Sequence, residues 1–329
     1  MLNGLILATV AVFALSWPGA GSAGATSSST TPFTVVALGD APYSDPLDYL
    51  RFSGLIHTIN ELKPVFSVHV GDIKAGSRPC TDRRLTRIRD YFDDFDSALI
   101  YTPGDNEWTD CHRVTAGGWD PLDRLELLRR HYFSTSMSHG KKPIRLTRQS
   151  DDERFEKFVE NARWTHGGVG FVTAHVVGSY NNAERRDVAA RAEFKERDKA
   201  SSTWIADGFA WAQKVNMKGL VIFIHADPLR GRDHDRKVGK PFGRTVKALK
   251  QGAVTFKKPV LVVHGDYHEY KLDKPFTTSA GKAIENLTRL EVQGAPEVWA
   301  TRIDIDPASP SLFKIAPLKP VGAEAPAPD

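Results

Sequence analysis

The chain has 329 residues, of which 41% are hydrophobic and 26% are charged, as is ordinary for a globular protein. Its formal net charge is +4, and acidic and basic residues are interleaved along it. This distribution argues against a basic patch that binds nucleic acid and against a polybasic membrane segment.

The N-terminus is expected to be a signal peptide, residues 1–23, so that the mature protein is secreted or periplasmic. An apolar run, Leu5–Trp17, is followed by small residues that end in an A-x-A-like site at residues 21–23. The run is shorter than the roughly 20 residues of a membrane span, so no stable span is expected after cleavage. An uncleaved anchor is the alternative, because Met1–Gly4 contains no Lys or Arg.

Apolar, β-branched runs that alternate with helix-period stretches predict an α/β fold. The expected strands are Phe33–Leu38, Val65–Val70, Ala98–Thr102, Val169–Val177, Leu220–His225, Pro259–His264, Leu290–Val292 and Trp299–Ile305. The expected helices are Leu47–Leu62, Arg83–Phe95, Leu122–Phe133, Ala183–Val215 and Arg244–Gln251. Nearly continuous apolar strands indicate parallel segments covered on both faces, and the closer spacing of the last strands favours an added antiparallel portion.

One domain, residues 33–306, is expected, because the sequence shows neither a 20–50-residue repeat nor a clean internal linker. A Ser/Thr-rich linker, residues 24–32, precedes it, and a Pro/Ala-rich tail, residues 307–329, follows it. The polar segment His139–Arg163 is interpreted as an insertion or a flap.

Cys80 and Cys111 are the two cysteines of the chain. In an exported protein, two cysteines in polar surroundings favour a disulfide, and closing a loop of roughly 30 residues contributes about 3–4 kcal/mol. Two free thiols are the alternative.

Four of the apolar runs are followed by the same dipeptide, Gly-Asp. The aspartates are Asp40, Asp72, Asp105 and Asp266. A single Gly-Asp after a strand is usually a turn or a helix cap. In an α/β sheet, however, ligands gather beyond the carboxyl ends of the strands, so these four side chains are expected to share one crevice.

Histidines accompany two of these strand ends. His225 ends the run Leu220–His225, and His264 and His268 flank the last Gly-Asp. Carboxylates and imidazoles crowded into one crevice repel or titrate unless cations hold them. The sequence therefore predicts a divalent metal site.

These motifs resemble those of the calcineurin-like metallophosphoesterase superfamily. The family pattern is Asp-x-His, Gly-Asp, Gly-Asn-His-(Asp/Glu), a strand-ending His and Gly-His-x-His. The matching segments, in the same order, are GDAPY at 39–43, GD at 71–72, GDNE at 104–107, HADP at 225–228 and GDYH at 265–268. The resemblance spans about Phe33–Ile305 and implies a four-layer αββα sandwich of mixed sheets with the site at the carboxyl ends of the strands.

The resemblance also implies two divalent metal ions, with Asp72 bridging them. Asp40 and His268 are then ligands of the first ion, and Asp105 and His225 are ligands of the second. Asp266 takes the place of a ligand His in the last motif and is a further candidate.

Several positions depart from the family pattern. Pro42 stands at a His position and cannot bind a metal, although Tyr43 beside it could supply a phenolate or a hydrogen bond. Asp105 replaces an Asn ligand, and Asp266 replaces a His, which leaves His264 as a possible substitute ligand. Because carboxylates replace neutral ligands, the site is expected to prefer manganese or iron over zinc.

The sequence identifies the groups that assist the leaving group less clearly than it identifies the metal ligands. Asn106 stands where the family has a catalytic His, so Asn106 and His112 are the catalytic candidates, with His234 as a further one. Lys74 could pair with a substrate phosphate, pair with the carboxylates or remain a solvated turn residue. Glu107 is expected to orient the site.

The implied function is hydrolysis of a small phosphorylated substrate by a metal-bound hydroxide at a dinuclear site of an exported enzyme. The first alternative is a degenerate member of the family that binds a metal or a ligand without hydrolysis. The second is a binding module on an unrelated α/β fold. A hydrolase of another type is disfavoured, because the sequence contains no G-x-S-x-G nucleophile turn. The sequence does not specify whether the substrate is a monoester or a diester, and it does not specify the oligomeric state.

Overall fold

The computed structural model describes residues 31–44, 46–183, 187–230 and 241–320. The expected signal peptide, the beginning of the linker, His234 and the last residues of the expected tail lie outside these ranges. Among the helices in the described ranges, none is both long and apolar enough to cross a membrane.

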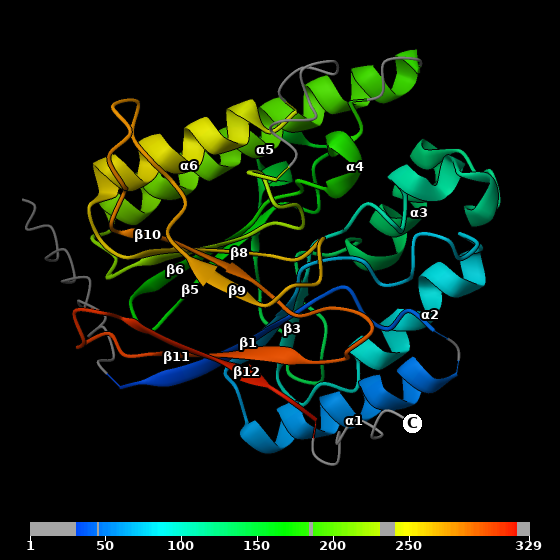
Figure 1. Ribbon diagram of the computed structural model, residues 1–329, viewed down its shortest axis with the longest axis horizontal. Helices are drawn as coiled ribbons and strands as arrows, with labels where there is room; N and C mark the ends of the chain where they lie inside the picture. Colours follow the sequence, from blue (N-terminus) through cyan, green and yellow to red (C-terminus); the bar gives the residue numbers. More distant parts are fainter. Residues whose placement is uncertain (1–30, 45, 184–186, 231–240, 321–329) are drawn as a thin grey trace, which may run out of the picture.

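Two mixed sheets lie face to face, and helices cover the outer face of each, which gives four layers (Figure 1). The first sheet has the strand order β12-β11-β1-β2-β3. Its strands are β1 (Phe33–Leu38), β2 (Phe66–His69), β3 (Ala98–Tyr101), β11 (Ala300–Ile305) and β12 (Phe313–Leu318). The strands β1, β2 and β3 are parallel, whereas β11 runs antiparallel to both β1 and β12.

The second sheet has the order β4-β5-β6-β7-β8-β10-β9. Its strands are β4 (Thr147–Arg148), β5 (Ala162–His166), β6 (Val169–Thr173), β7 (Leu220–Phe223), β8 (Val260–His264), β9 (Lys271–Asp273) and β10 (Leu287–Glu291). Its centre, β6-β7-β8-β10, is parallel, and antiparallel strands flank it on both sides.

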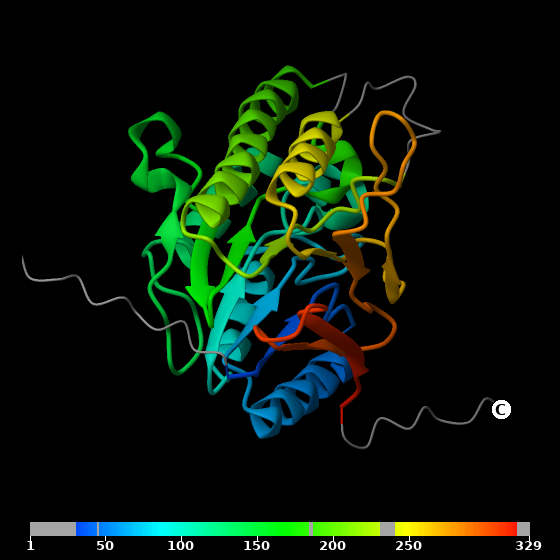
Figure 2. The same cartoon turned by 90° about the vertical axis from the view of Figure 1, so that its left-hand side faces the viewer.

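Helices pack on the outer faces of the two sheets (Figure 2). The first sheet is covered by α1 (Leu47–Leu62), α2 (Asp82–Phe92) and α3 (Pro121–Tyr132), and the second by α5 (Val188–Lys214) and α6 (Gly243–Phe256). The loops contain the short helix α4 (Gly178–Asn181) and the 3₁₀ turns η1 (Thr109–His112), η2 (Val114–Ala116), η3 (Gln149–Asp151) and η4 (Glu153–Phe155).

The alternation of side chains along each central strand explains its continuous apolar run. In β1, Val36 and Leu38 pack under the helices of the first sheet, whereas Val35 and Ala37 face the second sheet. Successive side chains of a strand point to opposite faces, so a strand buried on both faces must be apolar at every position. Together with the two mixed sheets and the helices on their outer faces, this burial confirms the predicted four-layer α/β fold.

The strands β4, β5, β9 and β12 were not predicted from the sequence, because they are short or only half-buried. The strand β12 lies within residues 307–329, where a tail was expected, so the fold continues past residue 306. Phe313 and Ile315 pack against the core between the sheets while their neighbours stay open to solvent. The sequence of β12, FKIAPL, alternates only over its first three residues before Ala and Pro interrupt the pattern, so the alternation is too weak to predict a strand. Likewise, the expected flap contributes β4 and the start of β5 to the edge of the second sheet.

The predicted disulfide between Cys80 and Cys111 is present, with a Cα–Cα distance of 5.7 Å. Both cysteines are fully buried. They follow β2 and β3, so the disulfide ties together two of the loops that carry Gly-Asp motifs.

A buried ionic cluster joins the two halves of the fold. The carboxylate of Glu160 is completely buried, lies 3.0 Å from Arg129 of α3 and accepts a 2.7 Å hydrogen bond from Nδ1 of His175, which follows β6. Burial alone would raise the pKa of Glu160, but Arg129 and His175 outweigh it and hold that pKa well below its ordinary value. The cluster therefore depends on an ionised Glu160.

We expect Glu160→Gln to reduce the free energy of unfolding by about 3–5 kcal/mol, because it leaves the charge of Arg129 without its buried partner. The matched control is Glu126→Gln, which removes the exposed partner of the same Arg129 and should cost within about 1 kcal/mol. Urea unfolding measures both. Since the folded pKa of Glu160 is depressed, its contribution is complete above the unfolded value of 4.5 and declines as pH falls below it. Equal losses for the two variants would contradict this assignment.

Candidate metal centre

The strand ends of both sheets converge on one group of acidic and imidazole side chains. Asp40, Asp72 and Asp105 follow β1, β2 and β3 of the first sheet, and His225 and Asp266 follow β7 and β8 of the second. This placement follows from the parallel order of these strands, since parallel strands end at the same edge of a sheet.

Two sets of potential ligand atoms share one residue. Those of Asp40, Asp72 and His268 lie within 4.8 Å of one another, and so do those of Asp72, Asp105 and His225. Asp72 is common to both sets, which is the position that the motif resemblance implies for a bridging carboxylate. Asp266 lies at the edge of the second set, with its carboxylate 3.8 Å from Nε2 of His225.

The backbone is strained where it delivers these side chains. The φ angle is +54° at Asp40, +58° at Asp72, +83° at Asp266 and +65° at His268. Non-glycine residues rarely adopt such angles, and they persist only where the surroundings enforce them, commonly at functional sites. Gly104 is required for a different reason, because a Cβ there would overlap both the backbone nitrogen and the carboxylate of Asp72.

Both histidines of the group present Nε2 to the carboxylates. Nδ1 of His225 and Nδ1 of His268 lie 2.9 and 2.8 Å from backbone carbonyl oxygens, and a carbonyl can only accept, so each Nδ1 carries a proton. Nε2 of His225 lies 2.8 Å from Asp105, and Nε2 of His268 lies 3.6 Å from Asp40. A ring fixed by a carbonyl at one nitrogen is typical of metal-binding histidines.

Burial makes the carboxylates of this group hard to ionise. Burial raises the pKa of Asp40, and it raises the pKa values of Asp72 and Asp266 well above their ordinary range. Burial would also raise the pKa of Asp105, but the hydrogen bond from His225 outweighs it and lowers that pKa to about 2. Oδ2 of Asp40 is buried and has no hydrogen-bond partner in the described part of the chain. These donors and their unbalanced charge fit divalent cations.

Asn106 and Tyr43 both contact the shared carboxylate. The amide of Asn106 donates to Oδ2 of Asp72 at 2.5 Å and to the hydroxyl of Tyr43 at 3.1 Å. The hydroxyl of Tyr43 donates to the same Oδ2 at 2.9 Å. Burial, reinforced by the charge of Asp72, raises the pKa of Tyr43 well above its usual value. The structure thus favours a protonated, hydrogen-bonding Tyr43 over a phenolate.

Glu107 fastens two of the Gly-Asp loops to each other. Its Oε1 accepts hydrogen bonds from the backbone of Asp72 at 3.1 Å, from the backbone of Gly104 at 2.6 Å and from the hydroxyl of Tyr101 at 2.7 Å. Lys74 is also buried, at 1% exposure, and interacts electrostatically with Glu107 and Asp72. Its Nζ donates to the carbonyl oxygen of Ala75 at 3.0 Å. This burial does not fit a solvated turn residue, which was one of the three predicted alternatives.

Two predicted residues lie away from the group. His112 is exposed, with Nδ1 bonded to the carbonyl of Thr109 at 2.6 Å, and it does not line the adjoining cavity. His264 belongs to a different set of side chains, with Asp227 and Glu291.

A cavity of about 450 Å³ opens beside the carboxylates and contains residues that the sequence did not indicate. Ser179 lies 2.7 Å from Asp105 and 2.7 Å from Asp110, and Arg113 lies 2.7 Å from Asp110. Ser179 belongs to the segment GSYNN, in which residues 179–182 all have positive φ. The polar residues of this segment were the available signal in the sequence, but Asn181 and Asn182 are buried and do not line the cavity.

Arg230 and Tyr267 form another part of the cavity wall, where the guanidinium of Arg230 stacks 3.7 Å from the centre of the Tyr267 ring. His69 was also missed, because nothing in the sequence distinguishes it from a core residue. Its Nε2 lies 3.0 Å from the carbonyl of Ala41, and its Nδ1 accepts from the backbone of Gly71 at 3.2 Å. It thereby links the loops after β1 and β2.

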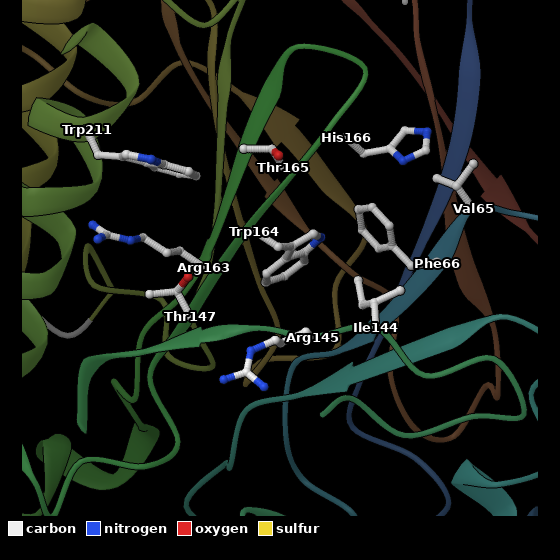
Figure 3. Close-up of a pocket in the computed structure, with 10 residues that line it drawn as sticks. All are labelled: Val65, Phe66, Ile144, Arg145, Thr147, Arg163, Trp164, Thr165, His166 and Trp211. Carbon is white, nitrogen blue, oxygen red and sulfur yellow. The ribbon is translucent and has the colours of Figure 1, made fainter. Parts of the chain in front are cut away.

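A second cavity, of about 390 Å³, lies elsewhere and contains none of the predicted site residues (Figure 3). It is lined by Val65, Phe66, Ile144, Arg145, Thr147, Arg163, Trp164, Thr165, His166 and Trp211. Arg163 projects toward Trp211, with its guanidinium 5.2 Å from the centre of a Trp211 ring. Because it has no carboxylates, this cavity is a poor candidate for a metal centre.

Comparison with known proteins identifies the fold. No protein-family model matches the sequence, and no curated protein sequence matches it. Among solved structures, a dimetal phosphatase from Danio rerio is similar with a TM-score of 0.50 and 11% identity, over 88% of this chain and 100% of that chain. This likeness shows the metallophosphoesterase fold that the sequence motifs predict.

Two further structures match with lower scores. A purple acid phosphatase from yellow lupin (Lupinus luteus) seeds has a TM-score of 0.48 and 11% identity, over 89% of this chain and 54% of that chain. The anchor in the inner membrane complex of Plasmodium has a TM-score of 0.48 and 9% identity, over 88% of this chain and 89% of that chain.

We expect Gly104→Ala to weaken metal binding at least about 10-fold, because the new methyl group displaces Asp72 from the centre of the site. The matched control is Gly54→Ala, since a Cβ at this helix position meets no atom within 4 Å. It should leave metal affinity unchanged and stabilise the fold by about 0.5–1 kcal/mol. Isothermal titration of both metal-stripped variants with Mn²⁺ tests this, and an unchanged affinity for Gly104→Ala would contradict the assigned geometry.

Proposed function

We propose that this chain, which has the metallophosphoesterase fold, is an exported hydrolase of phosphoric esters that uses two divalent metal ions. The observation that carries the proposal is the shared position of Asp72 between two sets of potential ligands. Asp40 and His268 are then the other ligands of one ion, and Asp105 and His225 are those of the second. Asp266 adds a further carboxylate beside them.

The chemistry of these groups fits the cations. The four aspartates carry four negative charges when ionised, which two divalent ions balance. The buried Oδ2 of Asp40, unpaired within the described ranges, gains a partner when a cation binds. Oxygen donors outnumber nitrogen donors, so we propose manganese or iron rather than zinc.

Bound at this site, the cations would supply positive charge for the phosphoryl oxygens. They would also lower the pKa of a water molecule, so that it can lose a proton and attack phosphorus near neutral pH. The chain itself positions the ligands and the substrate. Glu107 holds the Gly-Asp loops, and the amide of Asn106 faces the cavity while bound to Asp72. Arg113 and Arg230 line the same cavity, whose size suits a small substrate that carries phosphate.

Export is supported by the Cys80–Cys111 disulfide, since disulfides persist mainly in oxidising compartments. We propose a secreted or periplasmic location, reached through the signal peptide predicted at residues 1–23.

The second candidate function is a degenerate protein that binds metal or ligand without hydrolysis. Asn106 favours it, because an amide that donates to Asp72 stands where the family has a catalytic His. The pairs of ligands around Asp72 favour hydrolysis, since binding alone does not require two metal ions to share a carboxylate.

We expect the mature chain to hydrolyse aryl phosphate esters with Mn²⁺ or Fe²⁺, and Asp72→Asn to lower kcat/KM at least about 100-fold by removing the bridging charge. Asp96→Asn is the matched control, because Asp96 is exposed and pairs only with Lys141 among the described ion pairs. Steady-state assays with monoesters and diesters measure the effect. Turnover that survives Asp72→Asn would refute the metal assignment, and stoichiometric zinc alone in untagged protein would refute the metal preference.

We also expect the rate to depend steeply on the pKa of the leaving group. Among the described residues that line the cavity, His268 is the only histidine, and it is proposed as a metal ligand, so no imidazole there is free to protonate the leaving oxygen. A series of substituted phenyl phosphates should give a log(kcat/KM) that falls strongly as the pKa of the phenol rises. Asn106→His restores an imidazole at the family position and should make that slope shallower. A flat slope for the unmodified chain would show that another group protonates the leaving oxygen.

A further inference from the structure

A third set of metal-binding side chains lies beside the proposed dinuclear site. Asp227, His264 and Glu291 have potential ligand atoms within 4.8 Å of one another, and all three residues are buried. Asp227 lies in the loop after β7, His264 ends β8 and Glu291 ends β10. Three neighbouring elements of the second sheet therefore deliver one potential ligand each.

The imidazole of His264 has an unused nitrogen. Nδ1 lies 2.8 Å from the carbonyl oxygen of Gly265, and since a carbonyl only accepts, Nδ1 carries the proton and Nε2 of the neutral ring carries the lone pair. This Nε2 is buried and has no hydrogen-bond partner in the part of the chain that the structure describes. The ring has the same arrangement as His225 and His268, with a carbonyl at Nδ1 and carboxylates near Nε2.

The charges around the set are also unbalanced. Arg289 lies 2.9 Å from Asp227 and 2.6 Å from Asp273, so its single positive charge is shared by two carboxylates. Glu291 adds a third carboxylate, and among the described residues its Oε1 accepts a single hydrogen bond, from the backbone of Glu269. With the neighbouring Arg230–Glu269 ion pair included, two guanidinium groups face four carboxylates. When all are ionised, two formal negative charges remain, which a single divalent cation neutralises.

We propose that Asp227, His264 and Glu291 bind a third divalent metal ion of the first transition series. One imidazole nitrogen with two carboxylates suits Mn²⁺, Fe²⁺ or Zn²⁺ better than the hard cations Mg²⁺ and Ca²⁺, which take oxygen ligands. Asp227 also lines the large cavity, so the ion has a route of entry and water can complete its coordination.

The third ion would act on the dinuclear site by positioning it. Asp227 and Asp266 line the same cavity, and Asp266 borders the set around His225. A metal ion that joins Asp227 to β8 and β10 fixes the loop that holds Asp266. The inference goes beyond the proposed hydrolysis and stands on its own ligands.

Counting bound Mn²⁺ in metal-stripped, refilled protein tests the inference, with free Mn²⁺ followed by electron paramagnetic resonance. We expect three ions per chain, two in His264→Ala, and one in Asp72→Asn, which keeps only the third site. Combining Asp72→Asn with His264→Ala should remove that last ion. Glu291→Gln preserves the shape of the side chain and should weaken binding of the third ion at least about 10-fold. This variant tests the same site if His264→Ala fails to fold.

The control is Glu269→Gln, whose exposed carboxylate pairs with Arg230 outside the set and should leave all three ions bound. Two ions in both the unmodified chain and His264→Ala would overturn the third site. So would an equal count in Asp72→Asn and in the Asp72→Asn, His264→Ala double variant, since removing His264 would then have released no ion. Because these readouts count ions, they remain interpretable even if the chain hydrolyses no phosphate ester.

Discussion

The crowding of negative charge at the strand ends is the constraint on which this structure depends. Asp40, Asp72 and Asp105 are buried, and ligand atoms of Asp72 lie within 4.8 Å of those of Asp40 and of Asp105. Such carboxylates repel unless cations or protons intervene. His225 supplies one compensating group, and the buried Lys74 supplies another. Neither balances the whole group, and burial, reinforced by the charges of Asp105 and Glu107, raises the pKa of Asp72 well above its ordinary value. Such a group of donors fits divalent metal ions.

Several connections hold the carboxylates in place against this repulsion. Glu107 bonds the loops after β2 and β3, His69 bonds the loops after β1 and β2, and the disulfide from Cys80 closes the same region covalently. The positive φ angles of Asp40 and Asp72 show that the backbone is strained where it delivers the carboxylates. Strain of this kind is retained when the surrounding packing determines the conformation, as the buried sheets do here.

The substitutions at the motif positions have a common chemical direction. Relative to the family pattern that the motifs resemble, Asp105 stands in place of an Asn ligand, Asp266 in place of a His ligand and Asn106 in place of a catalytic His. Anionic donors are therefore more numerous than in that pattern, and imidazoles are fewer. In the proposed hydrolase, this difference would favour harder cations and reduce acid assistance to the leaving group. His264, which precedes the last motif, belongs to the set with Asp227 and Glu291, where the separate metal site is proposed.

The sequence by itself determined the local features: β1, α1, the Gly-Asp turns and the order of the motifs. These follow from apolar periodicity and from the residues that turns require, which act over a few positions of the chain. Only the tertiary structure decided which side chains meet, because contacts such as Ser179 with Asp105, or His264 with Glu291, join segments that are distant along the chain. The packing of the two sheets face to face sets those contacts, and no local pattern records it.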